Sequence, residues 1–141
     1  MNLEELDVVL GGRSILNPRE YNSLALAHIG DAVFEVLVRL TVLTDGNAPV
    51  NKLHKKARAI VNAKAQAEMY YRIQDLLTEE EADVFRRGRN AKSFTVPKNA
   101  DLMDSRHATG LEALFGYLYL KGEKERVVEL FKLGMAEKLE K

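Results

Sequence analysis

The sequence predicts an all-α fold, and three observations lead to this prediction. Each segment with a regular spacing of apolar residues follows the three- and four-residue period of a helix. No stretch shows the apolar–polar alternation that is typical of a half-buried strand. Turns and helix-start signals divide the chain into segments of helical length. With 141 residues, the chain has room for one domain and one hydrophobic core.

The chain begins with a short amphipathic segment over residues 1–16 and a helix-start signal over 17–20. In this signal Asn17 is a suitable cap and Pro18 a suitable first helical residue. The pattern leaves open whether this helix continues into the next segment or breaks near Asn22.

The segment 23–43 is a long, strongly apolar helix, around which we expect the other elements to pack. Most of its positions are apolar, so it should be buried nearly all round. One stripe at helical spacing consists of Leu26, Ile29, Val33, Val36 and Leu40.

Gly30 and Asp31 interrupt this apolar helix at its middle. An interior Gly costs about 1 kcal/mol relative to Ala, but it lets a backbone or ligand approach closely. A carboxylate away from water needs a compensating partner, and no Lys or Arg lies within one turn of Asp31. A metal ion or a residue of a distant helix could supply the compensation. The alternative is that Asp31 faces a wet crevice.

Two basic segments follow, and they give residues 46–100 five more basic than acidic residues although the whole chain has no net charge. The first lies in an expected helix over 50–73, and the second in an expected loop over 86–100. Such segments suit a phosphate backbone, or they form a solvated surface. The residues predicted to contact an anionic partner are Lys52, Lys55, Lys56, Arg58 and Lys64 of the first segment, and Arg87, Arg89, Asn90, Lys92, Ser93 and Lys98 of the second.

Three further helices are expected. Thr78 and Glu81 form a capping box that opens a short helix ending at Gly88. A helix over 104–120 should bury Leu111, Leu114, Phe115 and Leu118, and the last helix should turn Val127, Val128, Phe131 and Met135 inward.

Glu112 is a second acid in a mostly apolar helix, and it lies off the apolar stripe, with Gly116 one turn further on. Two such acids on separate helices, together with basic segments, match Mg²⁺ chemistry on phosphodiesters, with Mn²⁺ as an alternative ion. The chain has no Cys, and its three His residues are not spaced as a zinc motif. No Glu-x-x-His pair for a di-iron bundle is present. His28 lies one turn before Asp31. It either lines the site or has only a packing role.

The start of the chain lacks the layout of a signal peptide, and Arg39 interrupts the one long apolar run. We therefore expect a cytoplasmic protein without a membrane span.

The two acidic segments resemble the two catalytic motifs of the ribonuclease III family. Residues 28–33 read HIGDAV, and residues 111–120 read LEALFGYLYL. Residues 87–93, RGRNAKS, and 108–112, ATGLE, resemble the Mini-III branch, which lacks the separate double-stranded-RNA-binding domain. The resemblance covers residues 17–122 of a single domain spanning 1–141, with the last helix over 123–141.

The chain departs from the family pattern at three acidic positions, which are occupied by Leu24, Ala27 and Thr109. Only Asp31 and Glu112 match the family's catalytic and metal-binding acids, and His28, Gly30 and Thr109 are expected to line the site. The number of metal ions therefore stays open.

The resemblance implies an Mg²⁺-dependent endoribonuclease that cleaves double-stranded RNA. It also implies a homodimer and a role in maturation of the 23S rRNA precursor. The alternative is a catalytically inactive module that binds structured RNA on the same fold. Because a binding protein gains nothing from carboxylates beside phosphates, the two acids favour the enzyme.

Overall fold

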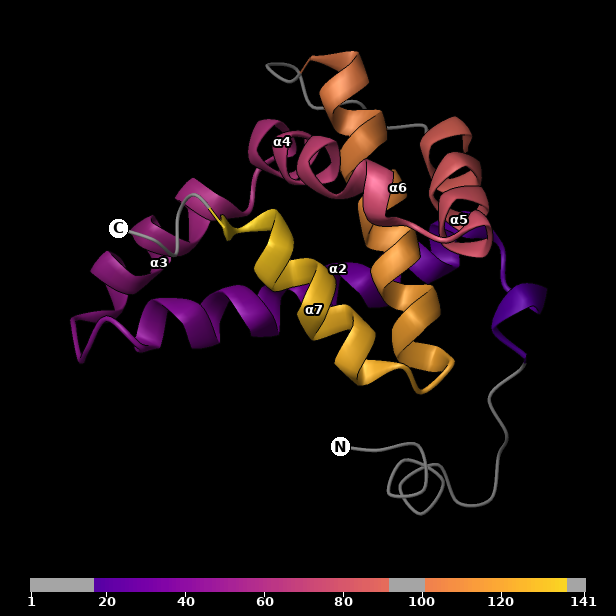
Figure 1. Ribbon diagram of the computed structural model, residues 1–141. Helices are drawn as coiled ribbons and strands as arrows, with labels where there is room; N and C mark the ends of the chain where they lie inside the picture. Colours follow the sequence, from indigo (N-terminus) through magenta and orange to yellow (C-terminus); the bar gives the residue numbers. More distant parts are fainter. Residues whose placement is uncertain (1–16, 92–100, 137–141) are drawn as a thin grey trace.

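The computed structural model describes residues 17–91 and 101–136, and the predicted all-α fold is confirmed. No strand occurs in these two ranges. The α-helices, labelled as in Figure 1, are α2 (Ser23–Leu43), α3 (Val50–Ile60), α4 (Ala63–Ile73), α5 (Glu79–Asn90), α6 (Leu102–Leu120) and α7 (Lys124–Gly134). Two short 3₁₀ helices cover Pro18–Glu20 and Gln74–Leu76. None of the helices in the described part of the chain has the length and apolarity to cross a membrane.

Helices α2 and α6 cross at the centre of the domain, and the others pack around them (Figure 1). Phe34 of α2 is fully buried between Phe115 of α6 and Phe131 of α7, with ring centroids 5.7 Å apart in both pairs. The predicted core stripe of α6, which includes Leu111 and Leu118, is buried as expected. Burying such large side chains stabilises the fold by about 1.5–3 kcal/mol each.

The expectation that α2 is buried nearly all round is wrong, because one face of it lies open. The buried positions are Leu26, Ala27, Gly30, Phe34, Val38 and Val42. In the predicted stripe only Leu26 is buried, whereas Val36 and Leu40 are more than half exposed. When nearly every position of a helix is apolar, several stripes fit the helical period, and packing against α6 selects one of them.

The helix start at Asn17 gives only one 3₁₀ turn, and α2 begins separately. The Asn22 side chain accepts a hydrogen bond from the Ala25 N–H (2.8 Å) and thereby caps α2. The question left open by the sequence is thus answered: the chain breaks at Asn22.

The expected single helix over 50–73 is also two helices, which are separated at Val61 and Asn62. Val61 leaves the helical conformation, and the Asn62 side chain accepts from the Ala65 N–H (2.9 Å). Asn62 thus caps the start of α4. The helical spacing of apolar residues continues across this break, so the spacing alone predicts one helix.

The capping box of α5 is confirmed, but the helix does not end at Gly88. Thr78 and Glu81 exchange the expected hydrogen bonds (2.9 and 3.1 Å), and α5 continues to Asn90. Arg87, Arg89 and Asn90 therefore lie on a helix, which corrects the predicted basic loop in this part. Lys92, Ser93 and Lys98 lie outside the described residues.

The last helix differs from the prediction at Val128, which is exposed rather than buried. Leu130 takes its place in the core beside Val127, Phe131 and Met135.

Candidate active site

The crossing of α2 and α6 depends on two glycines that face each other. A Cβ atom on Gly30 would lie 1.6 Å from the backbone oxygen of Glu112. One on Gly116 would lie 1.9 Å from the backbone oxygen of Leu26. Since real Cβ contacts are never this short, only glycine permits the two backbones to touch. The expectation that Gly30 admits another backbone is confirmed.

This contact brings Asp31 and Glu112 together, although 80 residues lie between them in the sequence. Asp31 follows Gly30 on α2, and the Glu112 backbone lies directly against Gly30. The two carboxyl groups share a hydrogen bond. Asp31 is exposed and Glu112 is half-buried, so Asp31 forms the open side of the pair. Asp31 is therefore not held away from water, and its exposure agrees with the alternative of an Asp that faces a wet crevice.

Burial, the hydrogen bond to Asp31 and the negative charge of Asp31 together raise the pKa of Glu112 to about 8. The more distant carboxylate of Glu35 acts in the same direction. Two adjacent carboxyl groups cannot both ionise freely, so the pair holds a proton at neutral pH. A divalent cation could replace this proton.

Gln66 of α4 forms the inner side of the site. Its side chain is 4% exposed and lies close enough to Glu112 to lower the pKa of that carboxyl group, against the larger raising effects. Its Nε2 atom makes no hydrogen bond of regular geometry in the described structure. Gln66 is not among the predicted site residues, because its only signal in the sequence is a lone amide among small residues of an expected helix.

The other predicted site-lining residues differ in their placement. His28 is exposed, one turn before Asp31. The Thr109 hydroxyl donates to the Ser105 carbonyl oxygen of its own helix (3.0 Å), so its hydrogen is already used. Gly30 is buried in the helix crossing. Of these three residues, Gly30 has a clear part in assembling the acid pair.

Comparison with known proteins identifies the family. The model of the ribonuclease III domain matches residues 24–123, which include both acids.

The chain belongs to the ribonuclease III domain family.

Its relatives place it within one branch of this family. It is 53% identical to the Mini-ribonuclease 3 of Thermoanaerobacter sp. (strain X514), with 79% of each chain covered. It is 47% identical to the Mini-ribonuclease 3 of Brevibacillus brevis, over 85% of this chain and 90% of the relative. A crystal structure of a Fusobacterium nucleatum protein superimposes with a TM-score of 0.80 at 32% identity, covering 89% of this chain and 97% of that one. The predicted Mini-III resemblance is confirmed, and the chain is a ribonuclease III-type endoribonuclease.

The residues of this ribonuclease III domain fit a metal site with few protein ligands. Within residues 17–91 and 101–136, no three His, Asp or Glu side chains gather as a metal site. Asp31 and Glu112 alone supply two carboxylates, and oxygen ligands suit Mg²⁺ or Mn²⁺. Mg²⁺ keeps several waters and commonly binds through one or two carboxylates and substrate phosphates. The acid pair therefore fits an ion completed by water and RNA.

The basic residues of the ribonuclease III domain fall into two groups. On α3 and α4, Lys52, Lys55, Arg58 and Lys64 are exposed, Lys56 is half-buried, and none makes an ion pair within the described structure. On α5, Arg86 and Arg87 both pair with Asp83, and Arg89 donates to the Asn90 side chain (3.2 Å). The first group thus offers more uncompensated positive charge.

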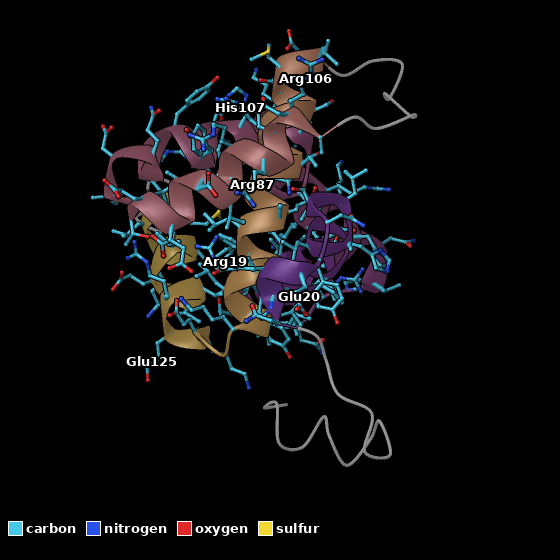
Figure 2. All side chains as sticks on the ribbon, turned by 90° about the vertical axis from the view of Figure 1, so that its right-hand side faces the viewer. Arg19, Glu20, Arg87, Arg106, His107 and Glu125 are labelled. Atoms are coloured by element: carbon cyan, nitrogen blue, oxygen red, sulfur yellow. The ribbon has the colours of Figure 1, made fainter. Side chains whose placement is uncertain are left out.

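A cavity of about 450 Å³ lies between α5, the start of α2 and the segment before α2. Arg19 and Arg87 line it, and Figure 2 shows both on the face turned to the viewer. Arg19 is not among the predicted site residues, because its segment shows only a helix-start signal in the sequence.

Arg106 and His107 lie at the beginning of α6 (Figure 2).

Proposed function

We propose that the chain is an Mg²⁺-dependent endoribonuclease that cleaves double-stranded RNA at the Asp31–Glu112 pair. The observation that carries this proposal is the backbone contact of Gly30 with Glu112, which sets two carboxylates side by side in a proton-sharing pair. Without a cation, the two carboxyl groups cannot both ionise easily. Beside a cation both can ionise, so the pair is suited to bind a cation. Bound Mg²⁺ would neutralise charge on the scissile phosphate and activate the attacking water.

The chain's own residues would act in three ways. Asp31, on the open side, would meet the ion and the phosphate first. Glu112, deeper in the site, would release its proton and complete the protein's share of the ligands. Gly30 and Gly116 keep the two acids at a fixed separation because their backbones touch, which reduces the reorganisation needed on binding.

The exposed basic groups would hold the RNA by its backbone. The deep, narrow major groove of A-form RNA cannot be read by side chains, so duplex RNA is recognised mainly by shape and phosphate contacts. The unpaired cations of α3 and α4 and the α5 residues Arg87, Arg89 and Asn90 suit this task, as do Lys92, Ser93 and Lys98 by their composition. The resemblance favours the 23S rRNA precursor as substrate and the cytoplasm as location.

We further propose that two copies associate through the open face of α2. Ile29, Val33 and Val36 line an apolar groove of about 450 Å³, whose other wall is formed mainly by α7. Val36 and Leu40 are 58% and 55% exposed. A contiguous apolar patch of this kind marks an interface, and a two-fold dimer would cover the same patch on both copies. This use explains why the outer face of α2 is as apolar as the inner one.

Sedimentation at micromolar concentration tests the dimer. Val36→Asp should convert the wild-type dimer to a monomer, since it places a charge in the groove. Val50→Asp is the matched control, because Val50 is equally exposed but lies outside the groove. A monomeric wild type that still cleaves duplex RNA would contradict the dimer.

The enzymatic proposal is tested with a long duplex RNA incubated with purified protein in Mg²⁺ and then in a chelator. Cleavage should occur in Mg²⁺ and stop in the chelator, whereas binding should persist in both. Binding without cleavage in either condition would favour the inactive RNA-binding module, and cleavage in the chelator would contradict the metal.

A further inference from the structure

Gln66 is a buried amide whose hydrogen-bonding capacity is not fully used. Its side chain is 4% exposed, and Nε2 has no regular partner. Leaving a buried donor unpaired costs free energy that a purely structural residue would be expected to avoid. The chain's other Gln in the described ranges, Gln74, is exposed and donates from Nε2 to the Tyr71 carbonyl oxygen (3.4 Å).

The position of Gln66 is fixed by its helix. It lies in the first turn of α4, just after the Asn62 cap, and α4 packs against α6. Its amide approaches Glu112 from the buried side, while Asp31 approaches the same carboxyl group from the open side. Three helices thus converge on Glu112, and each contributes one polar group.

We propose that Gln66 is a positioning residue: its Nε2–H group donates to the ionised Glu112 and turns that carboxylate toward the cation shared with Asp31. A carboxylate only accepts hydrogen bonds, and a primary amide offers two N–H donors. A cation bound to the Glu112 carboxylate on its open side leaves an acceptor oxygen on its buried side, where the amide of Gln66 lies in reach. Such outer partners fix the orientation of metal-ligating carboxylates.

This inference rests on the proposed function, because it assumes that Asp31 and Glu112 hold a cation. Gln66→Met removes both the donor and the acceptor at nearly constant volume. Gln74→Met, a Gln in the 3₁₀ turn after α4, is the matched control. Mn²⁺ affinity is measured by calorimetry without RNA, and the fold is followed by thermal melts of the helical circular dichroism signal in chelator.

Gln66→Met should melt at or above the wild-type temperature in chelator, because it removes an unpaired buried group. Its Mn²⁺ dissociation constant should rise about 10–100-fold, the usual effect of removing an outer partner of a metal ligand. The Mg²⁺ concentration for half-maximal cleavage should rise in parallel, with duplex RNA binding in chelator unchanged. Gln74→Met should match wild type in all four measurements. Wild-type Mn²⁺ affinity in Gln66→Met would reduce Gln66 to a packing residue and overturn the inference.

An NMR measurement on the wild type keeps the test decisive if Gln66→Met fails to fold. Mg²⁺ should shift one Gln66 side-chain amide proton downfield and slow its exchange with solvent, leaving the Gln74 amide unchanged. If neither Gln66 proton changes in saturating Mg²⁺, donation to Glu112 is wrong. A wild type that neither binds Mn²⁺ nor cleaves RNA would overturn the proposed function itself. A different outcome, in which the wild type binds Mn²⁺ and cleaves RNA and Gln66→Met does both equally well, would overturn only the role of Gln66.

Discussion

Helix α6 makes two close crossings, with α2 and with α5, and both involve glycine pairs. At the α2 crossing, Gly30 and Gly116 bring backbone against backbone. At the α5 crossing, a Cβ atom on Gly88 would lie 2.7 Å from the side chain of Ala113, and one on Gly110 would lie 2.8 Å from Phe85. The α5 crossing is surrounded by aromatic packing, including the stack of Tyr70 on Phe85 with centroids 3.7 Å apart.

The difference lies in what each contact fixes. At the α5 crossing the nearest atoms are the Cβ of Ala113 and the ring and backbone oxygen of Phe85, and they lie 2.7–2.8 Å away, so the approach is less close. At the α2 crossing the nearest atoms belong to the backbone of Glu112 itself, and the partner acid Asp31 is the next residue after Gly30. The separation of the two acids is therefore set by main-chain contact, which is the most rigid way to preorganise a site. The α5 crossing stabilises the fold without assembling such a pair.

The largest expected effect comes from breaking this contact. Gly30→Ala would place Cβ on a backbone oxygen, so α2 and α6 must separate, and we expect a loss of more than about 3 kcal/mol of unfolding free energy. Gly88→Ala meets the Cβ of Ala113 at 2.7 Å, a smaller overlap, and gains up to about 1 kcal/mol of helix propensity, so its net cost should be about 1–2 kcal/mol. Urea unfolding of both variants measures the difference. Equal destabilisation would mean that the two crossings are equivalent.

A smaller effect is expected in the pH dependence of stability without metal. The pKa of Glu112 is about 8 in the folded chain, against 4.5 for an ordinary Glu. Between these values the folded state keeps a proton that the unfolded state releases, so this group destabilises the fold progressively as pH rises from 4.5 to 8. Glu112→Gln should remove this component, which amounts to at most about 1.4 kcal/mol of unfolding free energy for each pH unit between these two values.

The control for this prediction is Glu125→Gln, an exposed acid in the first turn of α7 (labelled in Figure 2). Its pH profile should match wild type. A Glu112→Gln profile that falls as steeply as that of wild type would place the titrating group elsewhere.

The smallest expected effect is on duplex RNA binding, when single basic residues of α4 or α5 are replaced. Lys64 belongs to α4, which carries Gln66, and Arg89 belongs to α5. Replacing either with Ala should weaken duplex RNA binding and lower the salt slope by roughly 0.7–0.9 for each lost phosphate contact. Lys132→Ala, an exposed position on α7, should leave the slope unchanged. A change for Arg89 alone would confine the RNA to the α5 side.

The all-α class, the α6 core stripe and the α5 capping box could be predicted because each depends on local spacing. The convergence of Asp31 and Glu112 could be predicted from a different signal, namely a Gly beside or one turn from each acid in otherwise apolar helices. The order of the two motifs led to the right family. Their catalytic and metal-binding roles stay predictions.

The remaining features depend on contacts between distant segments. The buried face of α2 could not be selected from a helix that is apolar on both faces. The end of α5 was misplaced because Gly88 usually weakens a helix, whereas here it fits against Ala113 and Gly110 of α6. The break at Asn62 could not be predicted from the apolar spacing, because this spacing continues from α3 into α4 and only the capping side chain of Asn62 marks the break. Gln66 acquires its significance only from Glu112, which lies 46 positions later in the sequence.

The central claim is that Asp31 and Glu112 share one cation, and cleavage by Asp31→Asn and Glu112→Gln tests it most directly. Each variant removes one carboxylate with little change in shape, so the fold and duplex RNA binding should persist. Cleavage in Mg²⁺ should fall by at least about 10³-fold in both, since each loses a ligand of the same ion. Cleavage at the wild-type rate by either variant would remove that residue from the site and contradict the claim.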